Sequence, residues 1–264
     1  IKTKMKKSLF ILTLLILIMG CKKEGCTDYT ALNYNVHAEQ NDGSCEYNQY
    51  ENLISGQITE NLTLTSDKVW TLQGRVSVVN GTTLTIEPGT IIKAVAGTGS
   101  NASCLMISRG SLINAQGTAE QPIVFTSVAD DIEIGQLFGT SLNENVNGLW
   151  GGLIVLGDAP ISASGNMLSV QIEGIPASDP SGIYGGDNPN DNSGVLSYIS
   201  IRHGGANIGE GNEINGLTLG GVGSSTIINN IEIVANQDDG IEWFGGNVNC
   251  SNLLVWGTGD DCID

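Results

Sequence analysis

From about Leu53 onward, the hydrophobic residues fall in short β-branched runs separated by Gly, Asn and Asp. Within these runs hydrophobic and polar residues alternate, as where Leu84 and Ile86 alternate with Thr83 and Thr85. A period of two places the hydrophobic pair on one side of a strand and the polar pair on the other. No window shows a long 3.6-residue period with helix caps, so the pattern predicts an all-β body.

The body also repeats itself. Residues 83–94 align with residues 104–115 at an offset of 21, which predicts that Leu105 stacks on Leu84. A second repeat at an offset of 22 lies within residues 230–264. Its identical pairs are Asn230/Asn252, Asp238/Asp260, Asp239/Asp261 and Ile241/Ile263.

A unit of 21–22 residues cannot bury its apolar side alone and must stack on a neighbour. Two or three short strands per unit fit one coil of a parallel β-helix. Leucine-rich repeats share the period, but their leucine–asparagine pattern and helical segments are missing here. A propeller requires units about twice as long. The repeat therefore predicts a right-handed parallel β-helix over residues 51–264.

Five segments of the body carry a further indication: Leu84–Thr90, Gly110–Ser127, Leu149–Ala159, Arg202–Gly205 and Gln237–Gly246. Through them the body resembles the exported right-handed β-helix proteins of Bacteroidetes-type bacteria. The resemblance covers roughly residues 55–264 and implies a fold and a compartment, but no shared catalytic motif.

Two stretches, residues 128–148 and 162–194, interrupt the repeat and are rich in Asn, Asp, Ser and Gly. We expect them to be long loops that project from one edge of the solenoid, where binding usually occurs. The last repeat stops at Asp264 without a capping segment, so the β-helix is predicted to continue beyond it.

The first 20 residues are predicted to be an export signal. Lys4, Lys6 and Lys7 precede an apolar run of about 11 residues, which is short for a transmembrane helix. The run ends in Gly20-Cys21, which resembles the lipobox of bacterial lipoproteins. This resemblance implies that Cys21 carries acyl chains and anchors an outer-membrane lipoprotein. The alternative is an ordinary signal peptide followed by a chance cysteine.

Residues 21–50 form the expected anchor segment and a small module. Cys26 and Cys45 are 19 residues apart in an exported chain, which predicts a disulfide. The stretch also resembles a short module of surface and secreted proteins in the same bacteria. Its Asp and Asn side chains have two interpretations. They supply oxygen ligands to Ca²⁺, or they form local turns by hydrogen bonding to the backbone. These residues are Asp28, Asn33, Asn35 and Asp42.

The net charge of the chain limits the classes of partner that it can bind. The net charge is −17, and only five basic residues follow Lys23, against all 28 acidic ones. Such a chain repels polyanions unless a cation mediates, so we expect no nucleic-acid partner. The five are Lys68, Arg75, Lys93, Arg109 and Arg202.

The repeated acidic pairs are the first candidate site. Asp238 and Asp239 are expected beside Asp260 and Asp261 on the next coil, where like charges repel. A Ca²⁺ site, the paired carboxylates of a glycosidase, and a turn that satisfies each Asp with local N–H groups are the three interpretations.

Arg202 and His203 are the second candidate, because a polysaccharide lyase needs a base and a cation for the uronate. The alternative is a pair at a strand end that bonds loop carbonyls. Two roles are compatible with the sequence for four aromatic residues, namely stacking on sugar rings or packing in the core. These residues are Trp150, Trp243, Phe244 and Trp256. Three cysteines are left over, Cys104, Cys250 and Cys262, and this odd number indicates either a partner beyond Asp264 or free buried thiols.

Together these features predict a surface-anchored lipoprotein that binds a glycan or protein, with Ca²⁺ assistance as one option. A β-helix enzyme that degrades polysaccharide, using Arg202, His203, Asp238 and Asp239, is the alternative.

Overall fold

The computed structural model describes residues 22–27, 35–45, 50–209 and 212–264. The chain divides into two compact units, residues 1–49 and 50–264, and each is described by itself. Among the described residues, no helix has the length and apolar character needed to cross a membrane. The predicted lipid anchor, Cys21, lies outside the described residues.

The first unit is held by a disulfide and a short parallel pair of strands. Cys26 and Cys45 are bonded, with their Cα atoms 4.7 Å apart, which confirms the predicted pair. Strands β1 (Glu24–Gly25) and β2 (Gln40–Asn41) lie parallel. Closing a loop of this length contributes about 3 kcal/mol by restricting the unfolded chain.

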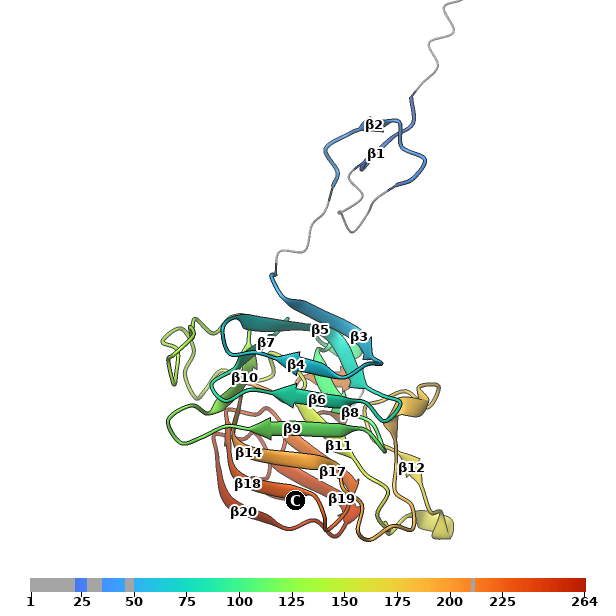
Figure 1. The fold of residues 1–264 in the computed structure, drawn as a ribbon, viewed down its shortest axis with the longest axis vertical. Coiled ribbons are helices and arrows are strands. Elements are labelled where there is room, and N and C mark those ends of the chain that lie inside the picture. Colours follow the sequence, from blue (N-terminus) through green and yellow to red (C-terminus); the bar gives the residue numbers. More distant parts are fainter. Residues whose placement is uncertain (1–21, 28–34, 46–49, 210–211) are drawn as a thin grey trace, which may run out of the picture. The chain divides into compact units, whose positions relative to one another are not determined.

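The second unit is a parallel β-helix (Figure 1). Each coil crosses three faces in turn, and each strand pairs in parallel with its equivalent on the next coil. The first face contains β4 (Leu62–Leu64), β6 (Thr83–Ile86), β9 (Leu112–Gln116) and the first parts of β14 (Gly194–Arg202), β18 (Ile227–Val234) and β20 (Cys250–Trp256).

The second face continues from the first. It contains the starts of β3 (Leu53–Ile58) and β5 (Val69–Val78), then β7 (Ile91–Ala94), β10 (Ile123–Ser127) and the later parts of β14, β18 and β20. The third face contains the ends of β3 and β5, then β8 (Cys104–Ile107), β11 (Leu153–Leu156), β17 (Leu217–Val222) and β19 (Ile241–Gly246).

Shorter elements lie in the connections. They are the antiparallel pairs β12 (Val170–Gln171) with β13 (Ile183–Tyr184) and β15 (Asn207–Gly209) with β16 (Asn212–Glu213), and the 3₁₀ turns η1 (Gly99–Asn101), η2 (Ser164–Asn166) and η3 (Pro180–Gly182).

The core is built from rows of inward side chains. One row on the third face stacks five buried residues on successive coils: Val76, Leu105, Leu153, Leu217 and Ile241. Such rows exclude water from the whole interior, and burial of each Leu or Ile side chain contributes roughly 1.5–3 kcal/mol.

The 22-residue repeat is confirmed. Ile231 pairs with Leu253, and Ile241 pairs with Ile263, each 22 residues later. The 21-residue alignment, in contrast, is wrong as a stacking register, because Leu84 pairs with Ile113. Residues 83–94 cover the first and second faces, whereas residues 104–115 cover the third and first, and the faces share one alternating pattern.

The two interruptions are also confirmed as long connections, but they do not simply project from an edge. Ile132, in the first, is fully buried against the outer side of β7 and β10 on the second face. Ile172 and Tyr184, in the second, pack on the outer side of β8 and β11 on the third face. Each loop therefore covers part of the outer side of one face.

Candidate functional site

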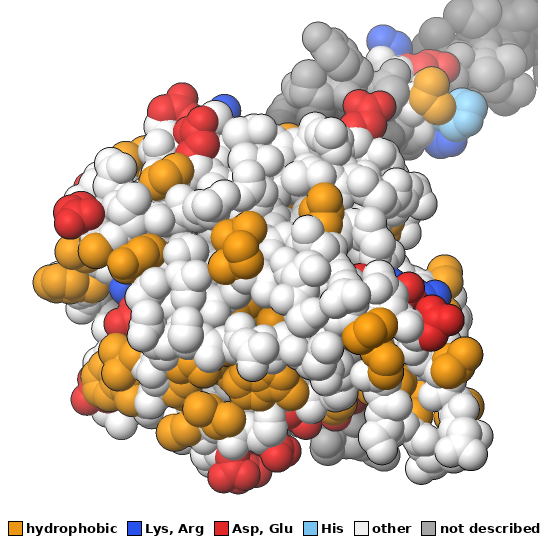
Figure 2. Space-filling model, turned by 60° about the horizontal axis from the view of Figure 1, so that its bottom comes forward, with side chains coloured by type: hydrophobic (Ala, Val, Ile, Leu, Met, Phe, Trp, Pro, Cys, Tyr) orange, Lys and Arg blue, Asp and Glu red, His pale blue; other side chains and the backbone are white. Residues whose placement is uncertain are grey.

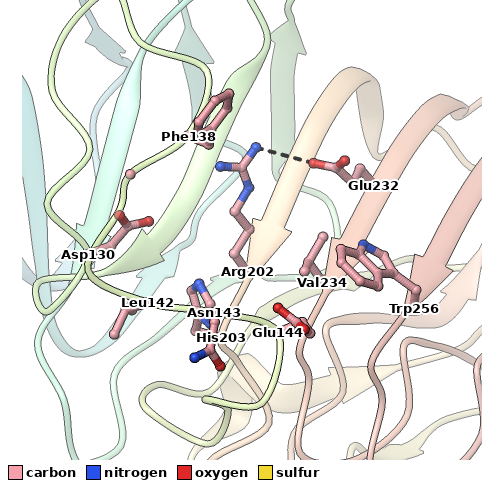
Figure 3. A pocket seen from close by; sticks show the side chains of 11 residues that line it. Asp130, Phe138, Leu142, Asn143, Glu144, Arg202, His203, Glu232, Val234 and Trp256 are labelled. Carbon is pink, nitrogen blue, oxygen red and sulfur yellow. Dashed lines mark hydrogen bonds and ion pairs between the residues drawn. The ribbon is translucent and has the colours of Figure 1, made fainter.

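The clearest concave site lies where the first long loop crosses the second face. It is a pocket of about 280 Å³ between residues 138–144 of the loop and the later parts of β14, β18 and β20 (Figure 3). Its lining residues are Asp130, Phe138, Gly139, Leu142, Asn143, Glu144, Arg202, His203, Glu232, Val234 and Trp256. We call it the loop groove.

Buried contacts hold the loop over the sheet. The carboxylate of Asp130 accepts a hydrogen bond from the Thr126 hydroxyl at 2.9 Å and another from the Ile132 N–H at 3.1 Å. Lys93 donates to the backbone carbonyl of Asp130 at 2.6 Å. Because Thr126, Asp130 and Ile132 are buried, these bonds anchor the start of the loop beside the groove.

The floor is a row of outward side chains on successive coils. Arg202 pairs with Val234 on β18, and Val234 pairs with Trp256 on β20. Arg202 is tied down by its neighbours: its Nε donates to the Ser200 hydroxyl at 2.7 Å, and its Nη2 lies 3.3 Å from the Glu232 carboxylate. The guanidinium is therefore positioned and partly neutralised within the floor.

His203 closes one end of the groove. It begins the corner between the second and third faces with a φ of 60°, and Ala235 and Gly257 repeat this left-handed conformation on the next coils. The side chain is only 5% exposed, and Nδ1 lies 2.5 Å from the carbonyl oxygen of Val146 in the loop. A carbonyl only accepts, so Nδ1 carries the proton. This is the predicted bond from a strand-end residue to a loop carbonyl.

Two aromatic side chains flank the groove. Phe138 is 69% exposed and Trp256 is 48% exposed, and in Figure 3 they lie on different sides of the Arg202–Glu232 pair. Large exposed apolar side chains that gather around a cavity are typical of binding surfaces.

The other predicted aromatics are packed. Trp150 is fully buried, stacks on Phe125 with ring centroids 6.5 Å apart, and donates from Nε1 to the Arg202 carbonyl at 2.7 Å. Trp243 packs against the core, and Phe244 lies edge-on to Tyr184. The interpretation of Trp150 as a sugar-stacking residue is therefore wrong, because its coil position points inward.

The repeated acidic pairs form a second cluster. Carboxylate oxygens of Asp238, Asp239 and Asp260 lie within 4.8 Å of one another, as predicted for stacked coils. Asp239 also accepts a hydrogen bond from the N–H of Asp261 at 2.8 Å, so the backbone of the next coil partly satisfies it. Asp261 itself takes part through this N–H.

Glu242 and Asp264 extend this cluster along the third face, and the sequence interpretation missed both. Asn215, fully buried one coil away, donates from Nδ2 to the Glu242 carboxylate at 2.5 Å. Its Oδ1 is buried and has no hydrogen-bond partner among the described residues. We call Asp238, Asp239, Asp260, Glu242 and Asp264 the acidic cluster.

Burial and repulsion perturb the protonation of these carboxyls. Burial, followed by the charge of Glu173, raises the pKa of Glu242 to about 7. Burial and then the charge of Asp238 raise the pKa of Glu173, and burial raises that of Asp239. The protein thus keeps a proton here that an isolated carboxyl releases.

The first unit offers less to a cation. The Asp42 carboxylate accepts the N–H of Ser44 at 2.9 Å, and Asn35 Oδ1 accepts the N–H of His37 at 3.0 Å, which are Asx turns. Neither residue belongs to a metal-ligand cluster found among the described residues. Asp28 and Asn33 lie outside those residues.

The three leftover cysteines are unpaired. Cys104 is buried, Cys250 is half-buried and Cys262 is exposed. Burial raises the pKa of Cys104 to about 12 and that of Cys250 to about 11, so both thiols stay protonated and unreactive at neutral pH.

The structure thus joins Arg202 with His203 in the loop groove and Asp238 with Asp239 in the acidic cluster, and the lining of the groove includes neither aspartate. It adds Phe138, Glu144 and Glu232, which sequence analysis missed. An aromatic residue in an Asn- and Gly-rich loop was the one available indication of Phe138.

Comparison with known proteins identifies the architecture. A family model described as a pectate-lyase-like β-helix domain matches residues 56–264. Neither the curated proteins nor the solved structures contain a significant match to the chain.

Proposed function

Since the chain belongs to the pectate-lyase-like β-helix family, we propose that it is a surface protein that binds an extracellular glycan in the loop groove. The observation that carries this proposal is the placement of Phe138 and Trp256 around the fixed Arg202–Glu232 pair.

The groove has the chemistry that a sugar chain requires. A sugar ring has an apolar face of C–H groups and an equatorial rim of hydroxyls. The indole of Trp256 and the ring of Phe138 provide flat apolar surfaces, while Glu144, Asn143 and Glu232 provide hydrogen-bond partners. The pocket stands on rigid coils and an anchored loop, so little ordering entropy is lost on binding.

Alanine substitution of the aromatics tests the proposal. Trp256→Ala and Phe138→Ala should each lower the affinity for a bound oligosaccharide by about fivefold, because stacking contributes on the order of 1 kcal/mol. Ile134→Ala is the matched control, since Ile134 is 50% exposed in the same loop but does not line the groove. Unchanged affinity in both aromatic variants contradicts the proposal.

We also propose that Cys21 is acylated and holds the protein at the outer membrane. The basic segment, the apolar run and Gly20-Cys21 support this. Cells grown with a labelled fatty acid should label the protein, and Cys21→Ser should lose both the label and membrane fractionation. Labelling that persists in Cys21→Ser contradicts the anchor.

Ca²⁺ binding at the acidic cluster is the cofactor proposal. Hard carboxylate oxygens suit Ca²⁺, and the unpartnered Oδ1 of buried Asn215 is a further neutral oxygen beside the cluster. Burial and then the charge of Glu173 raise the pKa of Glu242, and a bound cation offsets the second of these two causes. The residues of the acidic cluster therefore fit Ca²⁺. Binding of the ion would stabilise the like charges that the stacked coils bring together.

A polysaccharide-degrading enzyme is the second candidate. Glu242, with a pKa of about 7, can donate a proton at neutral pH, and Asp239 lies within reach as a second carboxylate. Release of reducing ends or unsaturated products that disappears in Glu242→Gln supports hydrolysis or elimination at this cluster. Loss in Arg202→Gln or His203→Gly instead places the chemistry in the loop groove.

A further inference from the structure

The charges of the loop groove specify the sugar class, and this inference rests on the glycan-binding proposal. Three carboxylates line the groove, from Asp130, Glu144 and Glu232, against the single guanidinium of Arg202. The face shown in Figure 2 likewise carries more acidic than basic side chains. An approaching ligand therefore meets a negative field.

Arg202 does not reverse this field. Its Nε is used by the Ser200 hydroxyl at 2.7 Å, and its Nη2 by Glu232 at 3.3 Å. The side chain is 13% exposed, so the floor covers most of it. A uronate carboxylate placed over the floor must compete with Glu232 for Arg202 and also approach Glu144.

Glu144 is the carboxylate that is free to receive a ligand. It is exposed in the loop wall, and none of the ion pairs among the described residues involves it. Asp130, in contrast, is buried and already accepts the Thr126 hydroxyl and the Ile132 N–H. Glu144 and the partly exposed Glu232 thus lie near the aromatic surfaces of Phe138 and Trp256.

We infer that the loop groove selects glycans whose sugars carry free, protonated amino groups, such as glucosamine chains, and rejects uronates. An ammonium group donates three hydrogen bonds without an acceptor of its own, so it complements the exposed carboxylate of Glu144 while its ring stacks on Trp256 or Phe138. Acetylation removes the charge and leaves only the stacking contribution. A carboxylate on the same sugar ring is repelled by the carboxylate of Glu144, whereas an ammonium group is attracted to it.

The test compares four hexasaccharides by calorimetric titration of the full chain: a glucosamine chain, its N-acetylated form, a neutral glucose chain and a galacturonate chain, the last with and without Ca²⁺. The glucosamine chain should bind about fivefold or more tightly than the acetylated and neutral chains, and salt should weaken it selectively. The galacturonate chain should show no binding at the groove.

Glu144→Gln should reduce glucosamine affinity by about fivefold and leave the acetylated chain unchanged. Glu133→Gln is the matched control, because Glu133 is exposed in the same loop and does not line the groove. Circular dichroism and thermal unfolding check that both variants fold as the parent does.

The possible outcomes distinguish failure of the charge inference from failure of the glycan-binding proposal. If galacturonate or acetylated chains bind as tightly as glucosamine and lose affinity in Trp256→Ala, the charge inference is overturned while glycan binding stands. If no hexasaccharide binds, both fail. Binding of a lysine-rich peptide without any sugar binding also overturns the inference, because the groove then recognises positive charge and not a sugar.

Discussion

Arg202 and Glu232 form an ion pair across two neighbouring coils, with Nη2 3.3 Å from the carboxylate oxygen. The pair joins β14 to β18 on the outer side of the second face, and the Ser200 hydroxyl bonds both partners. Side chains that stand on stacked strands are placed by the register, so the pair fixes the floor of the loop groove without any loop residue.

A double-mutant cycle measures this pair. Arg202→Gln and Glu232→Gln should each lower the free energy of unfolding, with a coupling of about 0.5–1 kcal/mol, because the glutamate side chain is 37% exposed and solvent screens the attraction. Urea unfolding of the parent, both single variants and the double variant gives the coupling. Strictly additive single effects show that the pair contributes nothing.

His203 is predicted to act as a clamp for the loop. His203→Gly preserves the left-handed backbone, as Gly257 does at the equivalent position, but removes the bond to the Val146 carbonyl. Loss of one buried hydrogen bond should cost about 1–2 kcal/mol and speed proteolysis within residues 128–148. Parental cleavage rates in this variant argue against the clamp.

The 22-residue repeat gave the correct register for the last coils, since Asp238, Asp239 and Asp260 converge as stacking requires. The 21-residue alignment failed, because residues on different faces of one coil follow the same alternating pattern and only pairing distinguishes them. Leu84 and Leu105 look equivalent in sequence yet point inward from different faces.

The groove could be predicted only in part. Arg202 and His203 were visible as a basic pair at a strand end. Phe138 and Glu144 were not, because their positions depend on how the loop folds back when Ile132 is buried against Ile91 and Val124. Such long-range packing of a loop leaves no periodic pattern in the sequence.

The raised pKa of Glu242 predicts a pH dependence of stability. Below the ordinary value of 4.5 the group is protonated in both folded and unfolded states, and its contribution is fully present. Between 4.5 and about 7 the folded protein retains a proton that the unfolded chain has released, so this contribution is lost as pH rises.

Thermal unfolding from about pH 5 to about pH 8 checks this sign. The parent should lose stability over this interval, and Glu242→Gln should lose less, because the amide cannot ionise. Asp131, whose pKa is lowered to about 2 by bonds from Thr140 and Ser141, stays ionised throughout and does not interfere. Identical pH profiles of parent and variant contradict the assignment to Glu242.

Calcium should bind at the acidic cluster and stabilise the last coils. Titration calorimetry should detect Ca²⁺ uptake that strengthens as pH rises, because a cation displaces the protons held by these carboxyls. Asp239→Asn should weaken binding most, since Asp239 belongs to both groups of converging carboxylates. Asp187→Asn, a substitution outside the cluster, is the control. If the unsubstituted protein takes up no Ca²⁺, the proposal of a Ca²⁺ site is wrong.

Trp256 fluorescence during titration with an oligosaccharide tests glycan binding at the loop groove most directly. Trp256 lines the groove, whereas Trp150 and Trp243 pack in or against the core. We predict a saturable change in emission that Trp256→Ala abolishes, with a weaker Kd by calorimetry. Trp70→Phe should preserve the change, because Trp70 lies on β5, donates from Nε1 to the Thr65 carbonyl and does not line the groove. A Kd that is identical in the parent and Trp256→Ala would contradict glycan binding at the loop groove.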